Sequence, residues 1–383
     1  MKILCVSHTN ITGQEGDSTH IRELALNLQK LGNNLLLICQ GGNQNCHFYK
    51  IVRLPNIKIK YLISLFLDLI SIPYLFFYIK RFKPDIIYYR DVATAGIISW
   101  FFKMPCVAEA NGIYPDLAKV ERPLFYKIAG TFLRMRERFQ YFSATRIICV
   151  TEGIKKELVR NYSVNEEICR VIHNGVNVGL FKPLSKVACR KKLGIKLNYF
   201  YMGFVGSFKA WRGLENLIEA MKIVKQREYD HIKCLFIGDG YLMSRLKEMV
   251  NRYDLSKNII FKGRVKYEDV PLFINSLDVC YLCWTGLKYG SSALKLYEYL
   301  ACARPVIASK VEGDREIVKN GNCGFLFDPD DVESLVSSII ESYNGRDKLY
   351  ELGRNGRRFI KDQFSWEKVA DKVQSVLKEA IKK

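Results

Sequence analysis

One stretch of the sequence combines an anion-binding pattern with a carboxylate. Three small residues, Gly290, Ser291 and Ser292, precede an expected helix, where exposed backbone N–H groups and hydroxyls can bind an anion. Lys295 and Glu298 follow three positions apart, and therefore on one helix face. A carboxylate there can accept hydrogen bonds from two sugar hydroxyls, as acidic residues do in dinucleotide-binding folds. The alternative is an ion pair on the helix surface, worth about 0.2 to 0.5 kcal/mol.

A second loop between an expected strand and helix carries two cations. Gly206 and Ser207 open this loop, and Lys209 and Arg212 follow before Gly213. Because a helix N-terminus already favours negative charge, the two cations suit a diphosphate. The alternative is that either cation points to solvent, as lone charged side chains of loops commonly do.

The loop after the first expected strand gives a weaker signal. It contains Gly13 and Gly16 just before a helix, so it can offer backbone N–H groups to an anion. It does not match the Gly-x-Gly-x-x-Gly dinucleotide fingerprint, and it lacks the Lys-Ser/Thr pair of a Walker loop. Alone, this loop indicates no particular ligand.

Short apolar runs alternate with helical patterns and indicate the elements that must hold these loops. The expected strands are residues 2–6, 34–39, 86–89, 106–110 and 146–150 in the first half, and 199–205, 233–237, 258–261, 279–283, 305–308 and 324–327 in the second. This alternation is typical of βαβ units with parallel sheets. Gly175, Gly179 and Pro183 interrupt the pattern. The sequence therefore predicts two doubly wound α/β domains, which bind ligands at the carboxyl ends of their strands.

Length and composition agree with two globular domains. The chain has 383 residues, 49% of them hydrophobic and 26% charged, which argues against a disordered, fibrous or membrane-bundle protein. The formal net charge is +20, so the surface should attract nucleic acid, an acidic membrane or phosphorylated small molecules. The twelve cysteines lie mostly in apolar runs, as in a reduced cytoplasmic protein. No second pair accompanies Cys280 and Cys283, so we expect core packing there rather than a metal site.

The first half concentrates its positive charge in two apolar segments. Residues 50–90 contain eight Lys or Arg and two Asp, and residues 119–160 contain ten Lys or Arg and four Glu, so each nets +6. Residues 61–79 are long enough for a membrane span, but Asp68 and Pro73 interrupt them and expected strands of one sheet lie on both sides. We expect helices that lie on an anionic membrane surface or, alternatively, ordinary solvated faces over a core.

The N-terminal sequence bears on location. Its first apolar run gives way to polar residues at Ser7, which leaves too little for a signal peptide. We therefore expect a cytoplasmic protein, peripheral on the inner face of the membrane.

Seven motifs occur in the order found in one known family. They are residues 13–16, 171–177 with 181–183, 206–213, 237–240, 261–265, 295–301 and 304–308. The chain resembles the family 4 glycosyltransferases of the GT-B type, in which two Rossmann-like domains face each other across a nucleotide-sugar cleft. The resemblance implies an N-terminal acceptor-binding domain (1–177), a C-terminal donor-binding domain (178–364) and a final helix (365–383) that packs back onto the N-terminal domain.

The resemblance also implies roles for individual residues. Arg212, Lys295, Glu298 and Asn111 form the expected catalytic set, in which Arg212 contacts the diphosphate and Glu298 the ribose. The expected donor-binding residues are Gly13, Gly16, Gly206, Ser207, Lys209, Gly238, Gly263, Arg264, Val265, Gly290, Ser291, Ser292, Ala293 and Leu294.

The chain departs from the family pattern at several of these positions. Ser207 stands where Arg is frequent, and Lys209 can replace the lost charge. Gly290 stands where many members have Glu, as in a subgroup with a Gly/Ser-rich loop and a Lys at the position of Lys295. Asn111 stands where many members have His, and Asn cannot act as an acid or base. Glu109 would share a face with Asn111 only if the strand continued past Ala110.

Together these inferences predict a retaining hexosyltransferase with no cofactor and no protein-bound metal. The donor would be a nucleoside diphosphate sugar, with UDP favoured, and the acceptor a lipid-linked or membrane-proximal saccharide in surface polysaccharide synthesis. Two alternatives stay open, a nucleotide-sugar epimerase of the same fold and a catalytically inactive membrane-associated scaffold. Nucleic acid is not an expected partner, because no recognised binding motif occurs.

Overall fold

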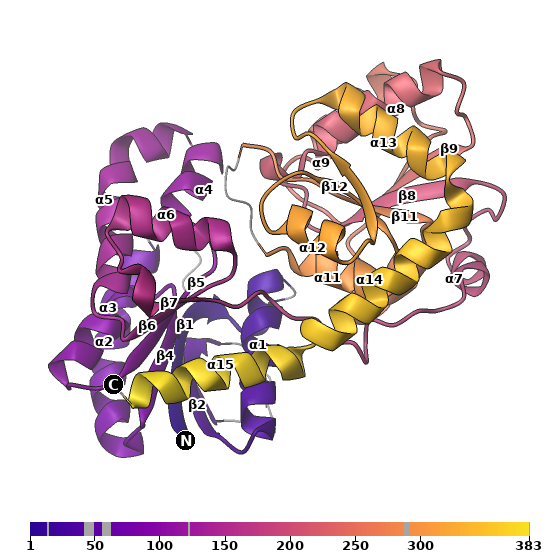
Figure 1. Cartoon of the computed structure of the whole chain (residues 1–383). Coiled ribbons are helices and arrows are strands. Elements are labelled where there is room, and N and C mark those ends of the chain that lie inside the picture. Colours follow the sequence, from indigo (N-terminus) through magenta and orange to yellow (C-terminus); the bar gives the residue numbers. More distant parts are fainter. Residues whose placement is uncertain (14, 42–49, 56–62, 122, 287–291, 383) are drawn as a thin grey trace. The chain divides into compact units, whose positions relative to one another are not determined.

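The structure is a computed structural model that describes residues 1–13, 15–41, 50–55, 63–121, 123–286 and 292–382. The chain folds into two compact units (Figure 1). Unit 1 comprises Met1–Gly175 and Trp366–Lys383, and unit 2 comprises Val176–Ser365. The last helix in the sequence thus belongs to the unit that contains the first strand.

Unit 1 is built on a parallel sheet whose described strands follow the order β3-β2-β1-β4-β5-β6-β7. The strands are β1 (Lys2–Asn10), β2 (Asn34–Gln40), β3 (Lys50–Leu54), β4 (Ile86–Arg90), β5 (Cys106–Ala110), β6 (Arg146–Cys149) and β7 (Cys169–Val171). Leu4 of β1 pairs with Leu36 of β2 on one side and with Ile87 of β4 on the other. The central strands are buried because helices cover both faces of a parallel sheet.

Helices alternate with these strands along the chain. They are α1 (Gly16–Lys30), α2 (Ile63–Phe82), α3 (Ala93–Phe101), α4 (Tyr114–Glu121), α5 (Pro123–Phe142), α6 (Glu152–Tyr162) and α15 (Trp366–Ile381), with a short 3₁₀ turn η1 (Glu166–Ile168). The buried side chains of α1 include Ile21, Leu24 and Leu28, a helical spacing that turns one face to the sheet. Helix α15 lies beside α1 (Figure 1), and the buried Trp366 makes an edge contact with the His20 ring.

Unit 2 repeats the architecture with the strand order β10-β9-β8-β11-β12-β13. The strands are β8 (Phe200–Val205), β9 (Ile232–Ile237), β10 (Ile259–Gly263), β11 (Val279–Leu282), β12 (Val306–Ser309) and β13 (Gly324–Phe327). Met202 of β8 pairs with Cys234 of β9 and with Val279 of β11. Aromatic rings of Phe204, Phe208 and Phe236 pack together in the core on this sheet.

The helices of unit 2 follow the strands in the same way. They are α7 (Lys186–Lys192), α8 (Leu214–Gln226), α9 (Met243–Arg252), α10 (Val270–Ser276), α11 (Leu294–Ala301), α12 (Asp314–Asn320), α13 (Val332–Asn344) and α14 (Leu349–Gln363). The described part of the unit also contains the 3₁₀ turns η2 (Ala210–Arg212), η3 (Tyr267–Asp269) and η4 (Arg346–Lys348). Both units thus show the doubly wound order, and the predicted fold class is confirmed.

The structure adds two strands that the sequence pattern did not indicate, β3 and β7, and both lie at edges of the unit 1 sheet. The apolar segment around Asp68 forms α2, in which Asp68 is buried. Among the described residues, no helix combines the length and the apolar content of a membrane span.

Candidate functional site

The strand order of unit 2 reverses direction between β8 and β11, and ligands of doubly wound sheets bind beyond the carboxyl ends of the strands at such a point. The loop after β8 contains Gly206, Lys209 and Arg212, and the loop after β11 leads to Lys295 and Glu298 on α11. The two segments that the sequence singled out therefore flank the same reversal.

Glycine backbones pack against each other at this edge of the sheet. The N–H of Gly206 donates to the carbonyl of Ile237, and the N–H of Gly238 donates to the carbonyl of Gly263, both at 2.8 Å. A Cβ added to Gly238, whose φ is +138°, would lie 1.9 Å from the carbonyl oxygen of Gly206. The close approach of three strand ends therefore requires glycine and leaves main chain at the surface of the site.

Lys295 crosses directly over Gly206. A Cβ on Gly206 would lie 2.0 Å from Cε of Lys295 and 2.9 Å from its Nζ. The lysine belongs to the first turn of α11, so its ammonium is held beside the carboxyl end of β8. A cation, a helix N-terminus and main-chain groups thus converge, which is an arrangement suited to phosphate oxygens.

Arg212 lies at the end of η2 with its guanidinium stacked over the Trp284 ring, 4.2 Å from the ring centroid. Its Nε and Nη1 atoms are buried and have no hydrogen-bond partner among the described residues. Burial lowers the pKa of Arg212 to about 10, and the charges of Tyr299 and Asp314 act against this shift. The guanidinium therefore stays charged at neutral pH with unused donors.

Asp314 stands at the start of α12 and is fixed by Trp284, whose Nε1 donates to its Oδ2 at 2.8 Å. Burial raises the pKa of Asp314 to about 7, while that hydrogen bond and the charge of Arg212 lower it. Near neutral pH this carboxyl therefore neutralises Arg212 only in part.

Glu298 is buried on α11, four positions past the helix start. Burial raises its pKa to about 7, and the charge of Lys295 and a hydrogen bond with Tyr267 act in the opposite direction. The carboxylate form can accept hydrogen bonds from vicinal hydroxyls, so its protonation state near neutral pH controls that capacity.

The remaining predicted donor residues lie around this centre. The ammonium of Lys209 lies 4.9 Å from the Trp211 ring centroid, and the half-buried Ser207 precedes Lys209 by two residues.

Other predicted donor residues follow β10 or precede α11. Arg264, which is exposed, and Val265 follow the end of β10. Ala293 caps α11, Leu294 begins it, and Ser292 shares a hydrogen bond with Tyr297 at 2.8 Å. Gly290 and Ser291 lie outside the described residues.

Sequence reasoning missed Trp284, Asp314 and Tyr267. Trp284 and Asp314 each follow a strand at its carboxyl end, which was a usable signal, since this edge binds ligands in such sheets. No local pattern marked Tyr267, because the fold alone brings η3 close to α11.

In unit 1 the loop with Gly13 is held by an arginine. Arg22 of α1 donates from Nη1 to the carbonyls of Ile11 and Gly13, at 2.6 and 2.7 Å. A Cβ on Gly13 would lie 2.5 Å from Oγ of Ser18, and Gly16 is the first residue of α1. The loop is therefore fixed to its own helix by contacts that exclude a side chain at Gly13.

A buried polar cluster lies beside this loop at the ends of β4 and β5. Glu109 accepts a hydrogen bond from the Tyr88 hydroxyl and lies 3.0 Å from Nε2 of His20. Arg90 donates to Asp17 at 2.6 Å.

Asn111 directly follows the last residue of β5, Ala110, and its buried Oδ1 has no hydrogen-bond partner among the described residues. Oε2 of Glu109 is thus occupied by protein groups, whereas Oε1 of Glu109 and the Asn111 amide oxygen have no hydrogen-bond partner among the described residues.

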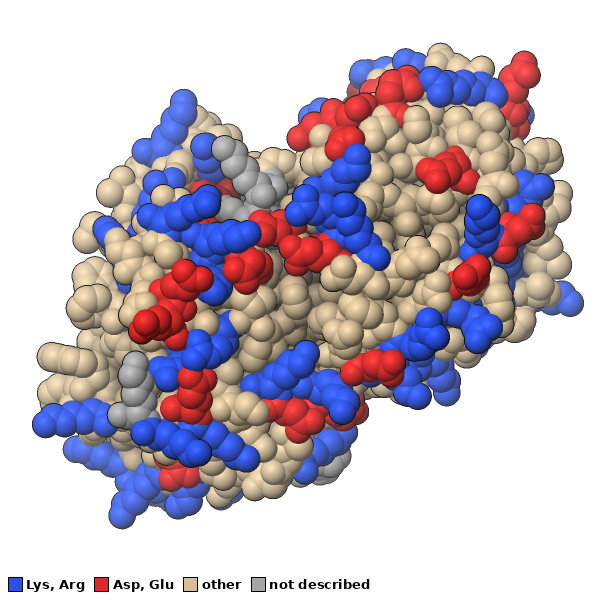
Figure 2. Space-filling model, viewed as in Figure 1, with Lys and Arg blue, Asp and Glu red and all other residues tan. Residues whose placement is uncertain are grey.

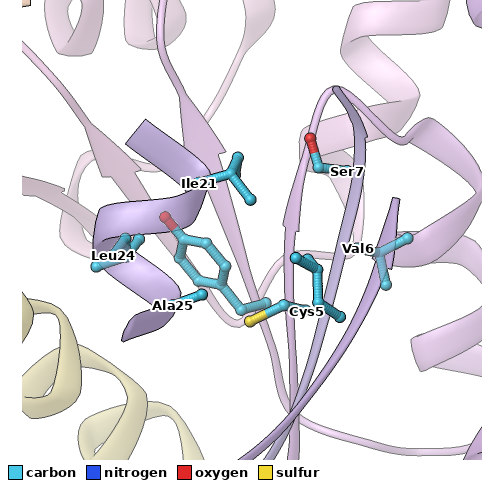
Figure 3. Close-up of a pocket in the computed structure, with 8 residues that line it drawn as sticks. Cys5, Val6, Ser7, Ile21, Leu24 and Ala25 are labelled. Carbon is cyan, nitrogen blue, oxygen red and sulfur yellow. The ribbon is translucent and has the colours of Figure 1, made fainter. Parts of the chain in front are cut away.

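A small cavity lies deeper in unit 1, between α1 and the sheet (Figure 3). Ile21, Leu24 and Ala25 of α1 face Cys5 of β1 across it, and its volume is about 10 Å³. That is about the space of one water molecule, so this cavity is a packing gap and holds no sugar nucleotide.

Two family models match consecutive parts of the chain. The model described as "Glycosyltransferase Family 4" matches residues 15–180, and the model described as "Glycosyl transferases group 1" matches residues 186–359. The two matches meet near the junction of the structural units and together cover most of the chain.

Individual proteins agree with the family models. An uncharacterized glycosyltransferase of Methanocaldococcus jannaschii is 31% identical over 64% of this chain and 64% of its own length, just under two thirds. The Escherichia coli enzyme named UDP-Gal:alpha-D-GlcNAc-diphosphoundecaprenol alpha-1,3-galactosyltransferase is 27% identical over 82% of this chain and 80% of its own. The solved structure of Anabaena HepE with UDP superposes with a TM-score of 0.79 at 19% identity, covering 99% of this chain and 100% of HepE. The chain therefore belongs to the family 4 glycosyltransferases and has their GT-B fold.

Proposed function

We propose that the protein transfers a hexose from a nucleoside diphosphate sugar to a hydroxyl of a saccharide. The observation that carries this proposal is Arg212, which keeps two buried guanidinium nitrogens without a partner among the described residues. Buried donors without acceptors are costly, and the oxygens of a diphosphate would supply the missing acceptors through charge-assisted hydrogen bonds.

The donor would lie at the strand reversal of unit 2. Glu298 would accept hydrogen bonds from the ribose hydroxyls, and Lys295 over Gly206 would contact the phosphates. UDP is the favoured nucleotide, and two similarities support it: HepE was solved in complex with UDP, and the E. coli relative is named for a UDP-galactose donor.

The proposed reaction retains the anomeric configuration. The bond between sugar C1 and the diphosphate oxygen breaks, and Arg212, Lys209 and Lys295 neutralise the charge that develops on the diphosphate, in place of a protein-bound metal. The acceptor oxygen bonds to C1 on the same face, and its proton passes to the departing phosphate oxygen. This route needs no protein base, which agrees with an asparagine at position 111, because an amide cannot act as an acid or base.

The acceptor would be a lipid-linked saccharide presented at the inner face of the membrane. Two features support this assignment: the basic, apolar helices of unit 1, and the E. coli relative, whose named acceptor carries diphosphoundecaprenol. Such a reaction belongs to the synthesis of surface polysaccharides.

The proposal is tested by a donor screen followed by product analysis. Nucleotide sugars are first screened by thermal stabilisation, because a ligand at 100 times its Kd adds about 2.7 kcal/mol. The stabilising donor is then incubated with and without a lipid-linked saccharide, and the product is analysed by mass spectrometry and NMR. We expect an acceptor-dependent glycoside with the donor's anomeric configuration. An epimerised donor formed without acceptor would instead indicate an epimerase, and no stabilisation by any donor would indicate an inactive scaffold.

A further inference from the structure

Helix α5 carries a stripe of large apolar side chains on its outward side. Six exposed residues form this stripe: Leu124, Ile128, Phe132, Met135, Phe139 and Phe142. Their spacing is three or four positions, so at 3.6 residues per turn they fall within roughly a quarter of the helix circumference. Ile128 is 89% exposed and Phe142 is 87% exposed, far beyond the scattered apolar residues of an ordinary surface.

The core-facing side of α5 combines the buried Leu133 and Tyr141 with polar residues. Glu137 is buried, and it accepts hydrogen bonds from the Tyr162 hydroxyl at 2.8 Å and from the Tyr114 N–H at 3.2 Å. The carbonyl of the buried Gln140 accepts from the Tyr89 hydroxyl at 2.6 Å. The polarity of α5 is thus partly inverted, because a surface helix normally turns its apolar stripe to the core. The outward stripe is therefore not needed to hold the fold together.

The apolar surface continues onto the neighbouring helices. Helix α3 contacts both α2 and α5, and the buried Asp68 of α2 accepts a hydrogen bond from Nε of Arg136 of α5 at 2.7 Å. The outward sides of α2 and α3 carry the exposed residues Phe66, Leu69, Phe77, Ile97, Trp100 and Phe101. We call these twelve exposed side chains of α2, α3 and α5 the three-helix face.

Basic side chains border this face, and acidic ones do not interrupt it. Lys127, Arg134 and Arg138 lie exposed beside the stripe of α5, and Lys80 and Arg81 lie at the end of α2. The two acidic residues among the described side chains of α2, α3 and α5, Asp68 and Glu137, are both buried. In Figure 2 the edge of unit 1 formed by these helices shows tan surface bordered by blue side chains.

We propose that the three-helix face docks on an anionic lipid bilayer, with α5 parallel to the membrane plane and its stripe at the boundary of the acyl chains. Apolar and aromatic residues flanked by Lys and Arg are the composition of interfacial helices, and each such cation adds about 1 kcal/mol near anionic lipid. A second copy of this chain fits less well, because a symmetric contact would set the same cations against each other without a carboxylate between them. The inference deepens the proposed function, on which it rests, by naming the surface that meets the acceptor's membrane.

Trp100 provides a direct reporter of docking. It is 72% exposed, whereas the other tryptophans, Trp211, Trp284 and Trp366, are buried. We expect its fluorescence to shift to shorter wavelength, and to be quenched by brominated acyl chains, when vesicles of phosphatidylglycerol and phosphatidylcholine are added at low salt. Vesicles of phosphatidylcholine alone should give a much smaller change, and Trp100→Phe should remove the response.

Two matched triple variants test the assignment. Leu124→Ser/Ile128→Ser/Phe142→Ser alters only exposed positions of the stripe, and Val187→Ser/Leu197→Ser/Tyr350→Ser alters exposed apolar positions of unit 2. We expect the vesicle partition coefficient of the first variant to fall on the order of 100-fold and that of the second to stay within about twofold. Equal binding by both variants would overturn the proposal, as would a Trp100 shift that depends on protein concentration without vesicles, since that indicates self-association.

The same variants separate this inference from the proposed function. Release of nucleoside diphosphate with a detergent-solubilised acceptor should be the same for the stripe variant and the unaltered protein, because no residue of the stripe belongs to the candidate site. Normal transfer without vesicle binding in the unaltered protein would overturn the docking surface alone. Vesicle binding without any transfer would overturn the proposed function alone.

Discussion

Arg212 and Glu298 are both buried, and the fold does not supply all the partners that their charged forms need. Two guanidinium nitrogens of Arg212 have no partner among the described residues, and burial raises the pKa of Glu298 to about 7. Strongly perturbed groups of this kind cluster where ligands bind. A bound diphosphate would supply the hydrogen-bond acceptors that Arg212 lacks, and ribose hydroxyls would stabilise the ionised form of Glu298.

The raised pKa of Glu298 predicts a pH dependence of donor binding. The ionised carboxyl accepts ribose hydrogen bonds, and protonation as the pH falls through about 7 removes that form. Donor affinity should therefore fall up to about tenfold per pH unit below pH 7. Calorimetric titration with an intact nucleotide sugar between pH 5.5 and 8 measures this slope, and Glu298→Gln should reduce it. A slope that is identical in the variant would show that Glu298 does not contact the donor.

A substitution at Gly206 should displace Lys295 and so weaken donor binding. Alanine there would place its Cβ 2.0 Å from Cε of Lys295, so the lysine must leave its position over the strand end. We expect Gly206→Ala to weaken donor binding by about 10-fold to 100-fold, in the range of one to two charge-assisted hydrogen bonds. Gly194→Ala is the control, because Gly194 also has a positive φ, +64°, but no neighbour within 4 Å. Equal affinities in the two variants would contradict the role of Lys295.

At the residue scale the sequence indicates the cations and carboxylate of the site but not their surroundings. Lys295 and Glu298 share a helix face, and the Arg212 loop follows a clear apolar run, so local spacing is enough to find them. Trp284 and Asp314 come from different strand ends, and only the strand order of the folded sheet brings them to Arg212. Neither local spacing nor composition contains that order.

Among the elements, α2 and α5 depend on one buried ion pair. Asp68 bonds Nε of Arg136 at 2.7 Å and accepts the backbone N–H of Ala93 at the start of α3 at 2.9 Å. Asp68→Asn can keep the contact with Ala93 but leaves Arg136 buried without its counter-charge. We expect a loss of about 3 to 5 kcal/mol in the unfolding free energy of unit 1, measured by hydrogen exchange resolved by segment.

An exposed ion pair supplies the comparison for Asp68. Lys225 bonds Asp254 at 2.8 Å, and Asp254 is 94% exposed with φ of +51°, a conformation that Asn tolerates. Asp254→Asn should leave the unfolding free energy almost unchanged, because water and salt screen an exposed pair. Similar losses of unfolding free energy in both variants would show that the buried pair of Asp68 and Arg136 stabilises the fold no more than an exposed pair does.

The elements themselves differ in how well the sequence predicts them. Residues 106–110 form β5 with the predicted bounds, because this central strand is buried along its whole length. Residues 324–327 form β13 with the predicted bounds although β13 is a partly buried edge strand, because the short apolar run of Phe325, Leu326 and Phe327 marks it in the sequence. The missed strands, β3 and β7, are edge strands of five and three residues. Both β3 and β7 are partly exposed and carry polar residues, Arg53 and Arg170, so their pairing follows from the neighbouring strand rather than from their own sequence.

At the scale of the molecule, the last helix contributes to the core of the first unit. Trp366 at the start of α15 is buried, with its ring 5.1 Å from the His20 ring. Trp366→Ala removes this packing and should cost about 3 to 5 kcal/mol. Because the fold has two units, hydrogen exchange resolved by segment is the suitable measurement. We expect faster exchange in α1 and β1 and unchanged exchange in β8 and β9, whereas equal acceleration of both units would contradict the assignment of α15.

Assays of donor-dependent sugar transfer test whether Arg212 and Glu298 act on the donor. Turnover should be compared among the unaltered protein, Arg212→Ala, Glu298→Ala and the control Arg252→Ala, which alters an exposed arginine paired with Glu248 on α9. We expect each site variant to lose on the order of 100-fold to 1,000-fold in turnover, the typical effect of removing one electrostatic donor, and the control to stay within about twofold. Unchanged turnover in both site variants would show that neither Arg212 nor Glu298 acts on the donor.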